Sequence, residues 1–456
     1  MLRVGLSVLL YDVIDALDNG LARTPPLGWS TWLTCQFPGK ECGHDVCNEA
    51  EVKQAAQSLN SSGMEALGWN YVVLDDCWAD TRNATTGRIT WDPSRFPTGI
   101  PALADWLHER GFLLGLYTSA GNEACSSGGR PIVVPGSRDH YARDARAFAD
   151  WGVDYVKLDW CGDVKKEPWI GARLHKEFAA ALNATGRAMV LEVVAGYWFL
   201  GAEIAQYAST WRFCEDHHDA WKSTEEAVVC RGLDRSGSAA SGAPGGWSYM
   251  DVLTTGGAGC AHGAGAHCAR QTDDEYRTEA ALWAITQSPL LVATDVRELT
   301  PLMKQVLLNA ELLADHQSTA TPPGALLAPP SPPLTVPYSG EDVPTAAAMG
   351  VATAADPANH ASCSFPWLCA VFGRRLNGDG SVWLIGLVNL ANASQAVHAS
   401  WEQLGWARED SACVRDVWQH EWIQTNATAQ VEAVVAAHGT ALLRLTKEQH
   451  GRSCLQ

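Results

Sequence analysis

The chain has 456 residues, of which 46% are hydrophobic and 18% are charged, and its formal net charge is −18. This composition can bury a large core, which excludes an intrinsically disordered chain. The acidic balance, without any run of Lys or Arg, argues against a nucleic-acid partner. No stretch reaches the roughly 18 apolar residues of a membrane-spanning helix, so no membrane span is expected.

The N-terminus carries a poor targeting signal, whereas the cysteines indicate an oxidising compartment. Residues 1–16, "MLRVGLSVLLYDVIDA", have one Arg and a short apolar run before Asp12 and Asp15, and we interpret them as a weak or truncated signal segment. The 14 cysteines include no CxxC pair, and paired histidines are lacking, so disulfides are favoured over zinc. We expect a secretory-pathway protein, extracellular or in a lysosome or vacuole, without metal or cofactor. Glycosylation sequons support this location, at Asn60, Asn83, Asn183, Asn392 and Asn426.

Eight candidate strands follow one another along the first two thirds of the chain. They begin at Leu27, Tyr71, Phe112, Asp154, Ala188, Ala208, Tyr249 and Pro289. Amphipathic helical patterns such as "PALADWLHERG" and "HYARDARAFADWG" lie between them. Strand and helix repeated eight times predict an α/β fold, a (β/α)8 TIM barrel over residues 17–316 with catalytic groups at the C-terminal strand ends. An open, doubly wound sheet is the alternative.

The character of the sequence changes after the barrel. Residues 317–345 contain the run "TPPGALLAPPSPPLTVP", which cannot carry a helix or a central strand and is predicted to be a linker. Beyond it, "LCAVFGRRLNGDGSVWLIGLVNL" has two β-like runs around the turn "NGDG", and "TALLRLT" forms another. Residues 346–456 are therefore predicted to form a small antiparallel β domain.

Charged side chains stand where the predicted strands end. In "DYVKLDWCGD", an otherwise apolar strand ends in Lys157 and Asp159, for which a salt-bridged strand end is the alternative to chemistry. A ring of carboxylates with one Lys and one Arg suits hydroxyl-rich ligands and two-carboxylate glycoside chemistry. Mg²⁺ bound by an Asp cluster is the main rival. The other members of the ring are Asp75, Asp76, Tyr117, Glu192, Arg212, Asp216, Asp251 and Asp295.

Several long motifs resemble one family of enzymes. They include "LDNGLARTPPLGWSTW", "LDDCW", "ADWGVDYVKLDWC", "WRFCEDHHDAWKS", "PGGWSYMDVL" and "ALWAITQSPLLVATDVR", in the family's order. On these motifs the sequence resembles the α-galactosidase and α-N-acetylgalactosaminidase family of retaining glycosidases, glycoside hydrolase family 27 (melibiase type). The resemblance implies a (β/α)8 barrel, a following antiparallel β domain, and cleavage of terminal α-linked galactose-type sugars with retention of configuration.

The resemblance also implies roles for individual residues. Asp159 matches the family's nucleophile, and Asp216 matches its general acid/base. Seven further residues match the substrate pocket, where they hold sugar hydroxyls or form the wall. They are Asp75 and Asp76 at O6 and O4, Lys157 at the ring hydroxyls, Arg212 at O2, and Trp32, Tyr117 and Asp251 in the wall.

Three disulfides follow from the same resemblance, namely Cys35–Cys77, Cys42–Cys47 and Cys125–Cys161. The chain also departs from the family. On the fifth strand, a family Cys and a specificity residue such as Glu are replaced by Val193 and Val194, and the cysteine's usual partner is Ala208. The family's Asn-Asp-Pro-Asp is "SYMD", which retains only Asp251. Specificity at C2 of the sugar is therefore open, as is the pairing of Cys214, Cys230, Cys260, Cys268, Cys363, Cys369, Cys413 and Cys454.

We therefore expect an exo-acting retaining glycosidase that removes terminal α-linked galactose from glycans, glycolipids or oligosaccharides. The first alternative is a sister specificity, for α-N-acetylgalactosaminides, β-L-arabinopyranosides or α-glucans. A sugar-binding protein on an inactive scaffold is the alternative from another class. It has no chemical need for both Asp159 and Asp216, so their presence argues against it. The expected partner is a small-molecule or glycan substrate, and a homodimer is an open expectation.

Overall fold

The structure is a computed structural model of the chain. It describes residues 19–34, 46–125, 132–166, 170–194, 202–212, 214–233, 241–242, 245–257, 267–328 and 369–448. The predicted signal segment, residues 1–16, lies outside these ranges, as does the predicted linker beyond Ala328. None of the described helices is long and apolar enough to cross a membrane.

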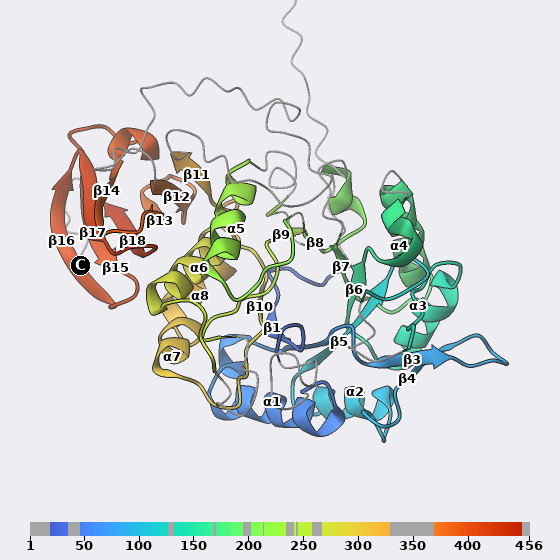
Figure 1. Ribbon diagram of the computed structural model, residues 1–456. Coiled ribbons are helices and arrows are strands. Elements are labelled where there is room, and N and C mark those ends of the chain that lie inside the picture. Colours follow the sequence, from blue (N-terminus) through green and yellow to red (C-terminus); the bar gives the residue numbers. More distant parts are fainter. Residues whose placement is uncertain are drawn as a thin grey trace, which may run out of the picture.

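Eight parallel strands form the central sheet (Figure 1). In spatial order they are β10 (Leu290–Val292), β1 (Leu27–Ser30), β2 (Tyr71–Leu74), β5 (Leu113–Ser119), β6 (Tyr155–Asp159), β7 (Val190–Val194), β8 (Thr210–Arg212) and β9 (Trp247–Tyr249). A parallel bridge between Leu253 and Val292 joins the segment after β9 to β10, the strand at the opposite edge of the sheet, so the sheet closes on itself. The predicted (β/α)8 barrel is confirmed.

Predicted strand starts differ from the observed ones by up to two residues, and the seventh strand is the one that begins earlier than predicted. The seventh strand was expected to begin at Tyr249, but β9 ends there. The chain cannot continue as a strand because Asp251, two residues later, has a φ of +79°, in the left-handed region. The difference places Asp251 at the C-terminal edge of the barrel.

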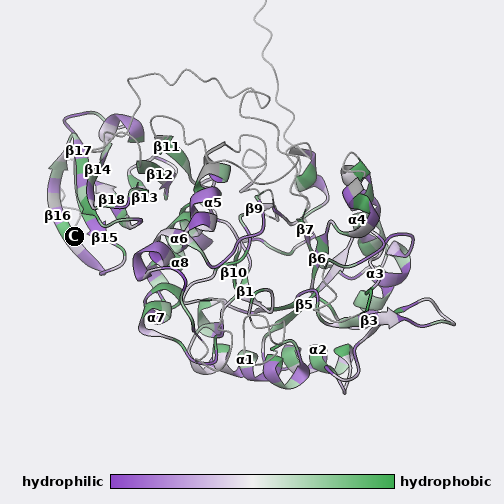
Figure 2. Ribbon diagram, in the orientation of Figure 1, coloured by the Kyte–Doolittle hydropathy of each residue, from purple (hydrophilic) through white to green (hydrophobic). Residues whose placement is uncertain are grey.

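Helices surround the strands. They are α1 (Glu49–Ser61), α2 (Ile100–His108), α3 (Tyr141–Asp150), α4 (Gly171–Asn183), α5 (Trp221–Leu233), α6 (Asp273–Ile285), α7 (Pro301–Leu307) and α8 (Ala310–Gln317). Whereas α6 is buried on nearly all sides, α1, α2 and α3 bury one face each. Figure 2 shows hydrophilic and hydrophobic residues alternating along α1 and α3, as such packing requires. Short 3-10 turns complete the connections, namely η1 (Glu65–Leu67), η3 (Gly162–Lys166) and η5 (Ala202–Gln206), and β3 (Ala79–Arg82) pairs with β4 (Ile89–Trp91).

The C-terminal part is an antiparallel β domain, as predicted. Its larger sheet has the order β11 (Ala325–Ala328), β12 (Cys369–Arg375), β13 (Val382–Asn389), β18 (Thr440–Lys447), β15 (Ser411–Asp416) and β16 (Glu421–Thr428). β14 (Gln395–Ser400) pairs with β17 (Gln430–Val435), and η7 (Trp401–Leu404) follows β14. β11 lies inside the stretch predicted as a linker, so that prediction is wrong for Ala325–Ala328. A Pro-rich run can supply an edge strand, the position that β11 occupies.

Polar contacts fix this β domain to the helices of the barrel. The Asn309 side chain donates to the Val417 carbonyl at 3.0 Å, and Thr440 donates to Thr278 at 2.8 Å. Arg444 pairs with Asp315 of α8 at 2.6 Å. The β domain therefore packs beside α6 and α8, on the outside of the barrel (Figure 1).

Candidate active site

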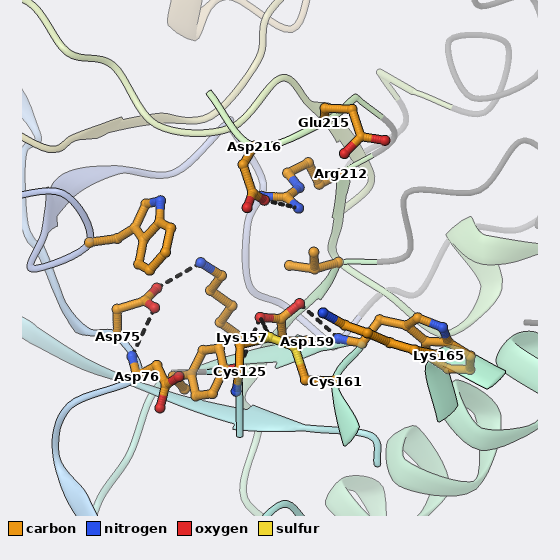
Figure 3. Close-up of a pocket in the computed structure, with 14 residues that line it drawn as sticks. Asp75, Asp76, Cys125, Lys157, Asp159, Cys161, Lys165, Arg212, Glu215 and Asp216 are labelled. Carbon is orange, nitrogen blue, oxygen red and sulfur yellow. Dashed lines mark hydrogen bonds and ion pairs between the residues drawn. A yellow bond between two sulfur atoms is a disulfide. The ribbon is translucent and has the colours of Figure 1, made fainter. Parts of the chain in front are cut away.

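A pocket of about 210 Å³ lies at the C-terminal ends of the barrel strands. Pockets for drug-sized ligands span roughly 300–1,000 Å³, so this one suits a single sugar ring. Eight of the nine residues predicted for catalysis and substrate binding line it: Trp32, Asp75, Asp76, Tyr117, Lys157, Asp159, Arg212 and Asp216. Figure 3 shows Lys157 and Asp159 between the Asp75–Asp76 side and the Arg212–Asp216 side.

Strand alternation explains why β6 supplies two of these groups. Side chains two residues apart on a strand share a face, so Lys157 and Asp159 point the same way. Lys157 is level with Tyr117 on β5 and with Glu192 on β7. Neighbours in a parallel register also share a face, and these three side chains therefore project toward the barrel axis.

Asp159 is held through both carboxylate oxygens. The Tyr117 hydroxyl donates to Oδ2 at 2.8 Å, and the Trp160 backbone N–H donates to Oδ1 at 2.7 Å. The Cys125 N–H donates in turn to the Tyr117 hydroxyl at 3.2 Å, and Cys125 Sγ lies 3.1 Å from Oδ2. These contacts fix the carboxylate in one orientation at the pocket surface.

Lys157 forms a buried ion pair with Asp75, with 2.6 Å between Nζ and Oδ2. The other Asp75 oxygen accepts the Asp76 N–H at 2.8 Å. Burial disfavours the charged ammonium, but the surrounding carboxylates of Asp75, Glu192, Asp251 and Asp159 outweigh it and raise the pKa of Lys157. Lys157 is therefore a permanent cation, and its remaining N–H groups are available to a ligand.

Arg212 bridges two carboxylates on the opposite side of the pocket. Its Nη2 lies 2.6 Å from Asp216 Oδ1, and its Nη1 lies 2.9 Å from Asp251 Oδ2. The Arg212 guanidinium lowers the pKa of Asp216, although burial opposes the shift. Asp251 is fully buried and does not line the pocket, so its predicted place in the wall is wrong. It stands behind Arg212, where its carboxylate accepts from Nη1.

Glu192 lies deeper in the barrel, next to the tyrosines of neighbouring strands. The Tyr155 hydroxyl donates to its Oε2 at 2.6 Å, while Oε1 is buried without a hydrogen-bond partner among the described residues. Burial raises the pKa of Glu192 to about 7, against the opposing effect of Lys157. Asp295 is the third charged residue of the predicted ring that does not line the pocket, after Asp251 and Glu192. It pairs with Arg297.

The disulfides differ in part from the expected set. Cys125 is bonded to Cys161, as the resemblance implied. Cys77 is bonded to Cys47, with 6.2 Å between their Cα atoms, so the expected Cys35–Cys77 and Cys42–Cys47 pairs are wrong. Cys47 precedes α1 and is fully buried against the segment after β2, within bonding distance of Cys77. Cys35 and Cys42 themselves lie outside the described residues.

A third disulfide joins Cys214 to Cys230, a pair that the sequence did not assign. Cys268, Cys369 and Cys413 are also disulfide-bonded. Cys77, Cys161 and Cys214 each lie within two residues of a pocket carboxylate. The disulfides therefore tie the loops that carry Asp76, Asp159 and Asp216.

The pocket also contains residues that the sequence analysis did not assign to it. They are Cys125, Trp160, Cys161, Lys165 and Glu215, while Val194, which the sequence analysis connects with specificity at C2, also lines the pocket. Two of them are direct sequence neighbours of an assigned residue, Trp160 of Asp159 and Glu215 of Asp216. Lys165 is not adjacent in sequence to an assigned residue. It lies in the 3-10 turn η3, and its place at the pocket therefore depends on the conformation of that turn.

The alternative of a Mg²⁺ site finds no support in the described part of the chain. The only group of three metal-ligating side chains there with converging ligand atoms is Cys125, Asp159 and Cys161. Its two sulfur atoms are joined in a disulfide, and Mg²⁺ takes oxygen ligands. Two acidic residues of the pocket, Asp75 and Asp216, are instead paired with Lys157 and Arg212, respectively.

Comparison with known proteins shows the family. A family model described as alpha galactosidase A matches residues 24–318, and one described as alpha galactosidase C-terminal beta sandwich domain matches residues 369–445. Alpha-galactosidase 3 of Arabidopsis thaliana is 31% identical, over 95% of this chain and 84% of its own length. Alpha-N-acetylgalactosaminidase of Gallus gallus is 34% identical, over 66% of this chain and 72% of its own.

A solved structure shows the same fold. The crystal structure of alpha-galactosidase I from Mortierella vinacea matches with a TM-score of 0.71 at 24% identity, over 94% of this chain and 98% of that chain. Barrel and β domain therefore occur together in both proteins. This chain belongs to the α-galactosidase and α-N-acetylgalactosaminidase family, glycoside hydrolase family 27.

Proposed function

We propose that this protein is a retaining exo-glycosidase that hydrolyses terminal α-linked galactose. One observation carries the proposal: Asp159 and Asp216 face a single sugar-sized pocket that is also lined by Lys157, Lys165 and Arg212. Retaining glycosidases need two carboxyl groups on one pocket, one as nucleophile and one as acid and base. Family membership supports the same chemistry, and relatives named alpha-galactosidase support galactose as the sugar.

In the first step Asp159 attacks the anomeric carbon while Asp216 protonates the departing glycosidic oxygen. The resulting glycosyl ester on Asp159 is then cleaved by water, which gives a proton back to Asp216. The Tyr117 hydroxyl and the Trp160 N–H support this assignment, because they orient the Asp159 carboxylate before the sugar arrives. Asp216 is half-exposed at 49% of its side chain, which suits a group that exchanges protons with water.

In this proposal the hydroxyl groups of the sugar form hydrogen bonds with charged side chains that the protein holds in place. Asp75 and Asp76 accept from O6 and O4, and Lys157 donates to the ring hydroxyls. The Asp75–Lys157 ion pair supports this, since it leaves both partners rigid and still able to make further hydrogen bonds. A pocket of this small volume admits one terminal residue, so internal sugars of a chain are excluded.

A second candidate is hydrolysis of terminal α-N-acetylgalactosamine. Val194 lines the pocket, level with Arg212 on the neighbouring strand. An apolar side chain there offers no acceptor to a 2-hydroxyl and leaves room for a larger substituent at C2. The relative from Gallus gallus with that name supports this second specificity within the same scaffold.

The cellular location is proposed on the disulfides. Structural disulfides persist in oxidising compartments, and three are built around the pocket rim. We infer a secretory-pathway protein that works outside the cell or in a lysosome or vacuole. The five sequon asparagines, Asn60, Asn83, Asn183, Asn392 and Asn426, are all exposed, which supports glycosylation. A homodimer stays a prediction.

A substrate panel tests the function. Wild-type protein is assayed with p-nitrophenyl α-galactoside, α-N-acetylgalactosaminide, β-L-arabinopyranoside and α-glucoside, with Asp159→Asn as the matched control. We expect hydrolysis of the α-galactoside with an acidic optimum, α-galactose as the first product by ¹H NMR, and no turnover by Asp159→Asn. Turnover of none of the four sugars, or β-galactose as the first product, would contradict the proposal.

A further inference from the structure

Arg212 is held differently by its two carboxylate partners. On the inner side Asp251 is fully buried, and its Oδ2 also accepts the His217 N–H at 2.8 Å. The Asp251 backbone, at φ +79°, occupies a region that a non-glycine residue adopts only when its surroundings enforce it. The Trp283 side chain donates to the Asp251 carbonyl at 2.7 Å and helps to enforce it. The inner contact is therefore fixed.

The outer contact is exposed to the pocket. Asp216 has 49% of its side chain exposed, against 1% for Asp251, and both Arg212 and Asp216 line the cavity. Arg212 itself is 9% exposed, so the two pairs differ in the exposure of their carboxylates, and a pair with a half-exposed carboxylate is easier to break than a fully buried one. A ligand in the pocket can therefore replace Asp216 on Arg212 Nη2 but cannot replace Asp251 on Nη1.

The ion pair between Arg212 and Asp216 disfavours the protonation that Asp216 needs in order to act as the acid. A general acid must carry a proton when the substrate is bound, and the Arg212 guanidinium lowers the pKa of Asp216 in the free protein. Lys157 of β6 and His218 of the same loop act in the same direction, while burial opposes them. Glu215 lines the same rim, and Glu226 of α5 lines a small neighbouring cavity with Asp216. The Arg212–Asp216 contact thus favours the carboxylate form of Asp216.

We propose that Arg212 changes partners when substrate binds: the 2-hydroxyl of the sugar accepts the Nη2–H bond that Asp216 holds in the empty pocket. Asp216, released from Arg212, then takes up a proton from solvent and becomes the acid. Asp251 is a positioning residue that keeps Arg212 in place during the exchange. The inference rests on the proposed glycosidase function. It adds that binding of the sugar's 2-hydroxyl to Arg212 allows Asp216 to be protonated.

The protons balance over the cycle. Binding converts the Asp216 carboxylate and one solvent proton into a carboxylic acid. Cleavage of the glycosidic bond moves that proton to the leaving oxygen, and attack of water on the glycosyl ester returns a proton to Asp216. Product release restores the Arg212–Asp216 ion pair and returns the proton to solvent. Substrates with no hydrogen-bond acceptor at C2, such as a 2-deoxygalactoside, cannot start the exchange.

Calorimetry with two neutral sugars tests the exchange without using activity. Galactose and 2-deoxygalactose are titrated into wild-type protein near pH 5 in two buffers of different ionisation enthalpy, which gives the number of protons bound. We expect galactose to bind with uptake of about half a proton and 2-deoxygalactose with none. Asp216→Asn is the matched control, because it retains the shape of the side chain and should bind galactose without proton uptake.

Equal uptake with both sugars, or no uptake with galactose, would overturn the inference. Failure of galactose to bind would overturn it together with the proposed function. If the α-galactoside is hydrolysed with retention but galactose binds without proton uptake, the function stands and the exchange alone is wrong. The two failures are therefore distinguishable.

The pH profiles of turnover give an independent test. The alkaline limb of kcat/KM reports the free enzyme, and that of kcat reports the complex. For the galactoside we expect the kcat limb to lie about one pH unit or more above the kcat/KM limb, and for the 2-deoxygalactoside the limbs should coincide. Asp251→Asn should raise KM for the galactoside but leave that for the 2-deoxygalactoside unchanged. A displacement of equal size for both substrates would refute the exchange.

Discussion

The Tyr117 hydroxyl donates a 2.8 Å hydrogen bond to Oδ2 of Asp159, the proposed nucleophile. The same hydroxyl accepts the N–H of Cys125, whose disulfide to Cys161 spans the end of β6. Backbone, phenol and carboxylate thus form one chain of contacts across two strands. The orientation of the nucleophile is therefore set by the Tyr117 hydroxyl of the neighbouring strand together with the adjacent Trp160 N–H.

Replacement of Tyr117 by Phe should slow turnover. A hydrogen bond to a charged group is worth about 1.5–3 kcal/mol, so its loss predicts a fall in kcat of roughly 10- to 150-fold. The aromatic ring remains in the wall, and we therefore expect a smaller change in KM. Steady-state kinetics with an α-galactoside measures both constants, and an unchanged kcat would show that Tyr117 does not orient Asp159.

Removal of one partner from the Lys157–Asp75 pair should destabilise the fold. Both side chains are buried, at 7% and 1% exposure. An unpaired buried charge costs about 3–5 kcal/mol, which predicts that Lys157→Met or Asp75→Leu alone lowers the free energy of unfolding by that amount. The double variant should recover much of the loss. Urea unfolding of all four proteins measures the coupling, and additive single losses would contradict a buried ion pair.

Glu192 should make stability depend on pH above the acidic range. Its pKa is raised by burial to about 7 from an ordinary value near 4.5. Because the folded protein holds the proton of Glu192 more tightly than the unfolded chain does, the contribution of this residue to the free energy of unfolding is highest below about pH 4.5. It falls by on the order of 3 kcal/mol as pH rises through 7. Glu192→Gln cannot ionise and should lack this loss. Urea unfolding at pH 4.5 and 7.5 compares the two, and parallel curves would place the Glu192 pKa in its ordinary range.

Local patterns explain which parts of this molecule could be predicted from its sequence. Apolar runs mark the barrel strands, and the two-residue alternation already places Lys157 and Asp159 on one face. The same alternation places Glu192 deeper in the barrel than Val194, whereas the position of Asp251 behind Arg212 could not be predicted, because it depends on how the chain packs after β9. Cys47 pairs with Cys77 for a similar reason, since spatial proximity decides which cysteines meet.

Val194 should control tolerance at C2 of the sugar. It lines the pocket level with Arg212, where a carboxylate would accept a hydrogen bond from a free 2-hydroxyl. A gained or lost hydrogen bond changes binding by about 0.5–1.5 kcal/mol. Val194→Glu should therefore sharpen preference for the galactoside over the N-acetylgalactosaminide, measured as the ratio of their kcat/KM values. Val194→Leu is the matched apolar control, and an unchanged ratio in Val194→Glu would remove this residue from the C2 side.

The central claim is that Asp159 becomes covalently glycosylated with the help of Asp216. In Asp216→Ala, a dinitrophenyl α-galactoside needs no acid for its first step but has no base for the second, so the intermediate should accumulate. Mass spectrometry of peptides after rapid acid quenching measures it. We expect one added galactosyl group on the peptide that contains Asp159 and none when Asp159→Asn is introduced as well. A galactosyl group on another residue, or rapid release of the dinitrophenol without any labelled peptide, would contradict the account.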